Sequence, residues 1–470
     1  MRSTFTGIET ALRAINAMQL ALDTTTHNIA NANTPGYSRQ RVELSASEPY
    51  TKPSMWRIPQ PIQIGTGVNI DGISRARDFF TDRQIRNATG ELGDHETTVR
   101  YYDRIEALIN EPSSSEFSSQ LDRFWNAWSD LALDPSDISA RAVVLEEGAR
   151  IADAMNRTTT QMTALRGDAA SEIGFVVADV NDLAQEVADL NRDIFKLVGI
   201  GQAPNDLMDR RDLMIDQLAR LTGATATFQA DGTADIMLDG RALVDGYTVD
   251  ALQTQAAGGG NVDIVWSSDL AAVALPSSEL GALQTLNNTT IPGVLADFDS
   301  FFTELTGGVN TIHQGGYGLS DPAGPPPGRD FFVLTGGTYS VNAALVADPA
   351  LVAAAQAPGV PGDNSNALAL AELATVKSTN GGTTSYNEHF AGLVAGIGAD
   401  ARRVIDAAAN QGAFVSYLQN QRQSVSGVSL DEEAANLVKF QHAYNAAARA
   451  LTAADEALDT IINRMGLVGR

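Results

Sequence analysis

The chain has 470 residues, of which 44% are hydrophobic, enough for about two to four packed domains. Its formal net charge is −25, so we expect neither nucleic acid nor an anionic membrane surface to be a partner. It has no cysteine, which excludes disulfides, thiolate metal sites and cysteine nucleophiles. Aromatic residues make up only 6%, which favours helices with modest apolar seams over a dense aromatic core.

The first 21 residues do not have the pattern of a secretory signal. Such a signal needs a continuous apolar core, and here Arg13, Asn16 and Gln19 interrupt the apolar residues. If the protein leaves the cell, we therefore expect it to do so without a cleaved signal peptide.

An amphipathic helix is predicted at the start of the chain. Its apolar residues recur at the seven-residue spacing of a coiled coil: Ile8, Ile15, Leu22 and Ile29, with Leu12 in a gap between them. The helix is expected to stop in the run Asn-Ile-Ala-Asn-Ala-Asn-Thr-Pro-Gly-Tyr at 28–37, where asparagine, proline and glycine favour turns.

Residues 40–75 read as extended chain with alternating stretches at 62–64 and 68–70, and 78–223 read as helical. A helix starting near Asn205 has that residue as its expected cap. From 224 to 275, short alternating runs separated by Asp-Gly pairs predict β-hairpins. Helix is expected again after Pro276, followed by a proline-rich loop at 321–328 and more helix from about 363.

The last helix has the most regular pattern in the chain. Its apolar residues repeat strictly every seven positions: Leu430, Leu437, Tyr444, Leu451 and Leu458. Ser429 and Glu432 fit a capping box at its start.

These elements predict a mainly α fold with a β-rich insert. The long terminal helices are expected to pair as a coiled coil, beside a helical-bundle middle domain and a small all-β outer domain. The expected boundaries are 1–40 with 426–470 for the terminal helices, 41–222 with 277–425 for the middle domain, and 223–276 for the insert.

The terminal helices are candidate interaction surfaces. Burying one Leu or Ile is worth about 1.5–3 kcal/mol, while ordering each residue costs about 1–2 kcal/mol of backbone entropy. Two lone helices with one seam are therefore marginal, and we expect arms that become ordered when neighbouring subunits add contacts. Periodicity alone leaves open that both helices dock on the chain's own core.

Two terminal motifs resemble signatures of bacterial flagellar rod, hook and hook-associated proteins. The first extends from residue 20 to 40 and includes Asn28, Asn31, Asn33, Pro35, Gly36 and Tyr37. The second covers 426–444. Internal stretches at 205–213, 309–316 and 362–370 are similar to the hook-associated protein 1 family in particular. Residues 1–6 match poorly, and the short insert indicates a reduced outer domain.

The resemblance implies a structural subunit that polymerises at the distal end of the hook and forms the hook–filament junction. It implies extracellular localisation, with four partners: further copies in a ring, the hook protein, a second junction protein and an export chaperone on the C-terminal helix. The heptad residues of both helices would then serve subunit assembly.

We find no constellation of residues that would support catalysis, a cofactor or a metal. The five histidines form no H-x-x-x-H pair, and the Asp-Gly pairs do not fit a calcium loop. The charged run 209–212 is interpreted as a solvated helix face or an intrachain ion pair rather than an intersubunit contact. Trp125 and Trp128 are interpreted as core residues, and His313 as a packing or hydrogen-bonding histidine.

Three alternatives remain at this stage. The chain could be a rod or hook subunit, although the internal motifs argue against it. It could be an enzyme, such as a wall hydrolase on an axial-protein scaffold, which would need a further domain. It could also be an adhesin or effector whose β insert binds a ligand.

Overall fold

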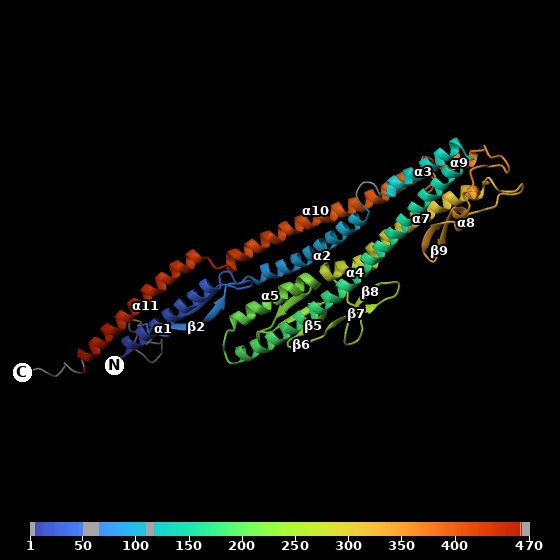
Figure 1. Ribbon diagram of the computed structural model, residues 1–470. Helices are drawn as coiled ribbons and strands as arrows, with labels where there is room; N and C mark the ends of the chain where they lie inside the picture. Colours follow the sequence, from blue (N-terminus) through green and yellow to red (C-terminus); the bar gives the residue numbers. More distant parts are fainter. Residues whose placement is uncertain (1–4, 50–64, 110–116, 461, 463–470) are drawn as a thin grey trace, which may run out of the picture.

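The computed structural model describes residues 5–49, 65–109, 117–460 and 462. The predicted alternation at 62–64 lies outside these residues. The molecule is elongated, and its first and last helices lie together at one end of it (Figure 1). There the first helix, α1 (Thr6–Ala30), packs against the last, α11 (Leu430–Asp459).

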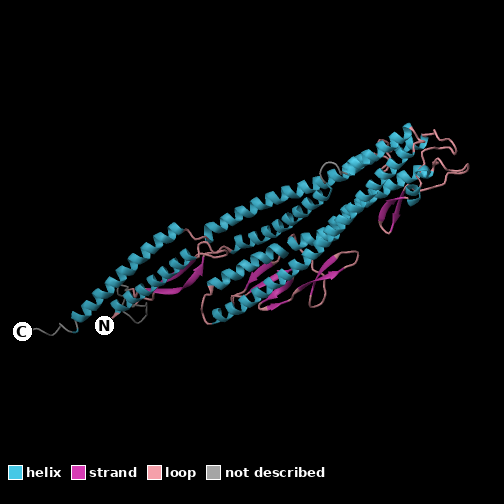
Figure 2. Cartoon of the chain, in the orientation of Figure 1, coloured by secondary structure: helices cyan, strands magenta, loops and turns pink. Residues whose placement is uncertain are grey.

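A body of long helices extends away from this pair (Figures 1 and 2). The predicted helical region 78–223 holds α2 (Phe79–Ile109), α3 (Phe117–Leu133), α4 (Ile138–Gly199) and α5 (Asn205–Thr222). The later helices are α6 (Glu279–Thr285), a π-helical turn (Leu286–Thr290), α7 (Ile291–Gln314), α8 (Ala343–Ala347), a 3₁₀ turn (Pro349–Leu351), α9 (Ser365–Glu372) and α10 (Tyr386–Ser426). A capping box of Ser385 and Glu388 begins α10.

The strands form small antiparallel sheets. β1 (Gln40–Ala46) pairs with β2 (Val68–Arg75) beside the terminal helices. The insert contains a four-stranded meander, β3 (Thr225–Phe228), β4 (Ala234–Leu238), β5 (Arg241–Asp245) and β6 (Thr248–Val249), and a hairpin, β7 (Leu252–Ala256) with β8 (Val262–Trp266). Both lie along α4. Asp239 and Gly240 turn β4 into β5 with φ of 52° and 73°, as an Asp-Gly hairpin requires.

A further hairpin, β9 (Phe332–Thr335) with β10 (Thr338–Val341), was not anticipated from the sequence. Its strands are four residues each, too short for the alternation to stand out. The predicted fold class is confirmed: the chain is mainly helical, with paired terminal helices and small antiparallel sheets.

The core contradicts the expectation of modest seams without a dense aromatic cluster. Aromatic residues are few, but many gather at the end of the body remote from the termini. The cluster consists of Phe117, Phe124, Trp125, Trp128, Phe298, Phe301, Phe302, Phe331, Phe332, Tyr386 and Phe390. The aromatic content is an average over the whole chain, so it does not report where aromatic residues are concentrated. Trp125 and Trp128 are buried core residues, as expected.

Candidate assembly site

The terminal helices run antiparallel to each other. Near the start of α1, a Cβ on Gly7 would lie 3.7 Å from the Cβ of Ala454, close to the end of α11. At the other end of α1, Asn28 Nδ2 donates to Glu433 Oε2 over 3.1 Å, in the first turn of α11. Among the described residues, the main hydrophobic core contains no side chain of α1 or α11. The pair therefore forms its own contact surface instead of docking on the core of the body.

The covered side of α11 carries the residues predicted from its seven-residue repeat. Leu437, Tyr444 and Leu451 are half-buried and Leu458 is buried. Leu430 differs, because it precedes the contact and is 55% exposed.

The covered side of α1 differs from the predicted row. Its buried residues are small or polar: Thr6, Ala11, Ala17, Ala21, Thr24, Thr25 and Asn28. Ile8, Ile15, Leu22 and Ile29 are only half-buried, and Leu12 is 49% exposed. Small side chains let two helix axes approach closely, which moves the bulky row to the edge of the contact. Within one chain the row therefore lies at the edge of the contact, and its role in contacts between subunits stays a prediction.

The motif after α1 folds into consecutive turns. Asn31 Nδ2 donates to the carbonyl of His27 over 3.1 Å, and Thr34 Oγ1 donates to Asn31 Oδ1 over 3.1 Å. Gly36 has φ of 79°, and a Cβ there would lie 3.2 Å from the Cβ of Leu213. Glycine is thus required both by its backbone conformation and by its close approach to α5.

Of the motif's other predicted residues, Asn33 and Pro35 are exposed, while Asn28 is the most deeply placed, with 1% exposure. Its Nδ2 donates to the carbonyl of Gln40 over 2.9 Å as well as to Glu433. Its Oδ1 accepts from the amide of Gln40 over 2.9 Å and from the hydroxyl of Tyr37 over 2.7 Å. One asparagine thereby joins α1, the motif, β1 and α11.

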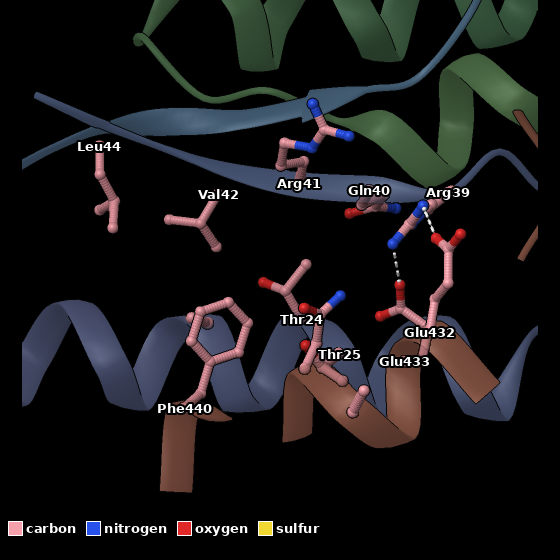
Figure 3. Close-up of a pocket in the computed structure, with 13 residues that line it drawn as sticks. Thr24, Thr25, Arg39, Gln40, Arg41, Val42, Leu44, Glu432, Glu433 and Phe440 are labelled. Atoms are coloured by element: carbon pink, nitrogen blue, oxygen red, sulfur yellow. Dashed lines mark hydrogen bonds and ion pairs between the residues drawn. The ribbon is translucent and has the colours of Figure 1, made fainter. Parts of the chain in front are cut away.

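Arginine 39 forms the second link between these elements. Its Nη1 lies 2.9 Å from Glu432 Oε2 and its Nη2 lies 2.6 Å from Glu433 Oε1, while its amide donates to the carbonyl of Ser426. Ser429 caps α11 by accepting from the amide of Glu432, which is one half of the predicted capping box. The Glu432 carboxylate pairs with Arg39, and among the described residues it makes no return bond to Ser429. Figure 3 shows these ion pairs closing one end of a cavity of about 530 Å³ between β1 and the two terminal helices.

Carboxylates at the start of α5 anchor the junction to the body. Asp209 Oδ2 accepts from the amide of Ser38 over 2.8 Å, and Arg75 Nη1 lies 2.8 Å from both Asp209 and Asp212. Arg77 Nη1 also lies 2.8 Å from Asp212. Burial opposes ionisation of Asp212, but the two guanidinium groups hold the pKa of this carboxyl below its usual value.

The charged run 209–212 therefore makes intrachain ion pairs, one of its two expected interpretations. The expected cap at Asn205 was wrong. Pro204 occupies the cap position, and Asn205 lies inside the first turn, where its Nδ2 donates to the carbonyl of Ile73 over 2.8 Å.

Sequence reasoning missed the partners of the motif, namely Arg39, Gln40, Asp206, Asp209 and Glu433. Gln40 Nε2 donates to Asp206 Oδ1 over 2.7 Å, across 166 positions of sequence. Arg39 and Gln40 are the last two residues of the motif at 20–40. Their polar side chains at the start of a predicted extended segment were the feature that could have identified them as partners.

Histidine 313 has the structural role expected of it. Its Nε2 accepts from the amide of Ala353 over 3.0 Å, so Nδ1 carries the proton and donates to the carbonyl of Arg329 over 2.8 Å. Burial lowers its pKa to about 4. The described residues contain no group of three or more potential metal ligands and no helix that is long and apolar enough to cross a membrane.

Comparisons with known proteins agree on one class. The family described as flagellar hook-associated protein FlgK helical domain matches residues 102–332. The termini match two families of basal body rod proteins, at residues 8–37 and 419–465. The chain is 34% identical over its full length to the full length of flagellar hook-associated protein 1 of Bacillus subtilis. It is 24% identical to the protein of that name from Escherichia coli, covering 97% of this chain and 99% of the relative.

A solved structure shares the fold. The flagellar hook junction protein FlgK from Burkholderia pseudomallei superposes with a TM-score of 0.63 at 16% identity, covering 73% of this chain and 100% of that one.

The paired termini, the motif junction and these matches define a structural protein of the bacterial flagellum, not an enzyme. The chain belongs to the flagellar hook-associated protein 1 family. The rod-like matches are confined to the termini, whereas the full-length relatives are hook-associated proteins, so a rod or hook subunit is the poorer alternative.

Proposed function

We propose that copies of this chain polymerise at the distal end of the hook and form the hook–filament junction through their paired terminal helices. The observation that carries this proposal is that α1 and α11 pair with each other yet leave bulky apolar side chains uncovered. Leu12, Leu430 and Val438 are each about half exposed. Further burial of one such side chain is worth about 1 kcal/mol, half of its full transfer free energy.

In this proposal, the row Ile8, Leu12, Ile15, Leu22 and Ile29 meets the terminal helices of neighbouring copies. Leu437, Tyr444, Leu451 and Leu458 hold α11 in the pair, and the exposed Leu430 adds contacts to neighbouring copies. The Asn28 link joins the pair to β1, and the bond from the amide of Ser38 to Asp209 joins the same segment to α5. Together with the Arg39 ion pairs, these bonds fix the angle at which the pair leaves the body.

The domain boundaries predicted from the sequence are part of the proposal. Residues 1–40 with 426–470 would line the inside of the junction, and 41–222 with 277–425 would form its outer wall. The insert, 223–276, lies along α4 and shares its hydrophobic core, which supports an outer body of one piece rather than a hinged appendage.

We also propose the finer partners. They are further copies in a ring, the hook protein, a second junction protein, and an export chaperone that covers the apolar row of α11 before assembly. Export would proceed without a cleaved signal peptide, to the outside of the cell. The interrupted apolar residues at 1–21 support that route.

The test is a gene deletion followed by electron microscopy of the cells. We expect hooks without filaments, and flagellin in the medium. Normal filaments on the deletion strain would contradict the proposal.

Complementation then tests the apolar row. Leu12→Glu and Leu430→Glu are expected to be exported without restoring filaments. Leu133→Glu is the matched control, since this leucine is 86% exposed on the body at the end of α3. Full complementation by both variants of the terminal helices would show that the row does not serve assembly.

A further inference from the structure

An aromatic hollow lies at the start of α2, on the side of the body that carries the sheets. Phe79 and Phe80 are both more than half exposed, and with Arg83 and Phe228 they line a cavity of about 410 Å³. The guanidinium carbon of Arg83 lies 5.9 Å from the ring centroid of Phe80. Among the described residues, no carboxylate pairs with Arg83. Exposed arginine and aromatic side chains together have the composition of an interface anchor.

A second exposed aromatic surface lies on α10. Tyr417 is 64% exposed, and Phe414 is exposed one turn before it. No acidic residue occurs between Asp406 and Asp431. In a chain of net charge −25, a contact between copies is least opposed by repulsion where acidic side chains are absent.

These two surfaces face in opposite directions. α2 and α10 pack through Ile85, Ala88, Val415 and Leu418. Measured from the middle of each contact at about 100° per residue, Arg83 lies about 170° around α2 and Tyr417 about 130° around α10, so both side chains point away from the other helix. In Figure 1, α10 accordingly runs along one long edge of the molecule, with α5 and the sheets along the other.

The surfaces also lie at nearly the same height along the molecule. Arg422 Nη1 lies 3.8 Å from Asp82 Oδ1, so these two residues are level on the antiparallel helices. Counting from them, Tyr417 and Arg83 differ by four residues, or about 6 Å along the helix axis. Two surfaces on different sides of the molecule, at the same position along its long axis, can meet when neighbouring copies are related mainly by rotation about that axis. A head-to-tail contact of this kind forms a ring when the rotation closes.

We propose that the hollow formed by Phe79, Phe80, Arg83 and Phe228 receives the Phe414–Tyr417 face of α10 from a second copy of this chain. Arg83 then lies against the electron-rich face of the incoming tyrosine ring and makes a cation–π contact with it. This inference rests on the proposed ring of copies, and it assigns the contact between outer bodies to α2 and α10.

Because the chain has no cysteine, introduced thiols report contacts without background. The double variant Phe80→Cys, Tyr417→Cys is expressed in the deletion strain, and isolated hooks are treated with a bismaleimide and immunoblotted. We expect a ladder of covalent multimers. The single variants should remain monomeric, and so should the control Phe80→Cys, Phe175→Cys, whose second position is an exposed phenylalanine on α4.

Two results would overturn the inference: hooks that contain the double variant but give no ladder, or dimers from Tyr417→Cys alone, which would mean that α10 contacts α10. Absence of the chain from the hooks would instead refute the proposed function, and this interface with it.

A charge test needs no cross-linker. Tyr417→Arg places a cation opposite Arg83 and should reduce filament-bearing cells at least about tenfold, the scale of an aromatic anchor, while Tyr417→Phe keeps the ring and should not. Thermal unfolding of purified Tyr417→Arg must match wild type, as expected for an exposed site. Normal filament numbers with Tyr417→Arg would contradict the proposed contact.

Discussion

Replacing Asn28 by alanine should loosen the terminal helices without unfolding the body. The substitution deletes four hydrogen bonds, two of them to the backbone of Gln40 and one each to Tyr37 and Glu433. It leaves their polar atoms in a site that is almost closed to solvent.

The magnitude follows from this count. Each hydrogen bond contributes about 0.5–1.5 kcal/mol net, and water entering the vacated space recovers part of the loss. We expect local opening of α1 and α11 to become easier by about 2–4 kcal/mol. Amide exchange that proceeds through this opening should then accelerate by about 30- to 1,000-fold.

Hydrogen–deuterium exchange of the purified full chain, read on peptides from α1 and α11, measures this directly. Asn16→Ala is the matched control, because Asn16 is an exposed asparagine on the same helix. Peptides from α4 should exchange alike in both variants. Equal exchange of α1 in Asn28→Ala and Asn16→Ala would refute the reasoning.

Two further predictions concern the body. Gly148→Ala should destabilise it by about 1–3 kcal/mol, because the new Cβ would lie 2.6 Å from the ring of Phe331. Gly167→Ala on the same helix meets open space and should stabilise by about 0.5–1 kcal/mol, and urea unfolding of the two variants compares them. His313 has a pKa of about 4 when folded and about 6.5 when unfolded, so the unfolded chain binds more protons between these values. The contribution of neutral His313 to the free energy of unfolding is complete above pH 6.5, and about 3 kcal/mol of it should be lost as the pH falls to about 4. His313→Gln should remove this pH dependence in urea unfolding followed by tryptophan fluorescence. An unchanged pH profile in that variant would contradict the prediction.

The sequence predicted the helices well where one strong period governs a long segment. Leu437, Tyr444 and Leu451 lie where their repeat puts them, because α11 packs mainly against one helix, α1. In α1 the repeat did not identify the buried residues, since a pattern of hydrophobicity gives little weight to alanines such as Ala17 and Ala21.

The site was less predictable than the fold. The motif was recognisable, but its partners come from positions up to 405 residues away, as with Asn28 and Glu433. A local pattern contains no information on which distant carboxylate completes a buried network. The charged run 209–212 illustrates this, since its sequence is equally compatible with an exposed helix face. Only the structure shows that Arg75 and Arg77 lie beside it.

The antiparallel pairing of the two ends has a consequence for the order of folding. Closing a flexible loop of 405 residues costs about 5 kcal/mol in chain entropy, more than one marginal helix pair returns. Once the body has folded, α1 and α11 leave it side by side. The contacts within the body have by then already closed most of the loop between them. We therefore expect the helix pair to be the last part of each subunit to form. The unit that joins the growing structure would then be a finished body whose two loose ends are completed in place.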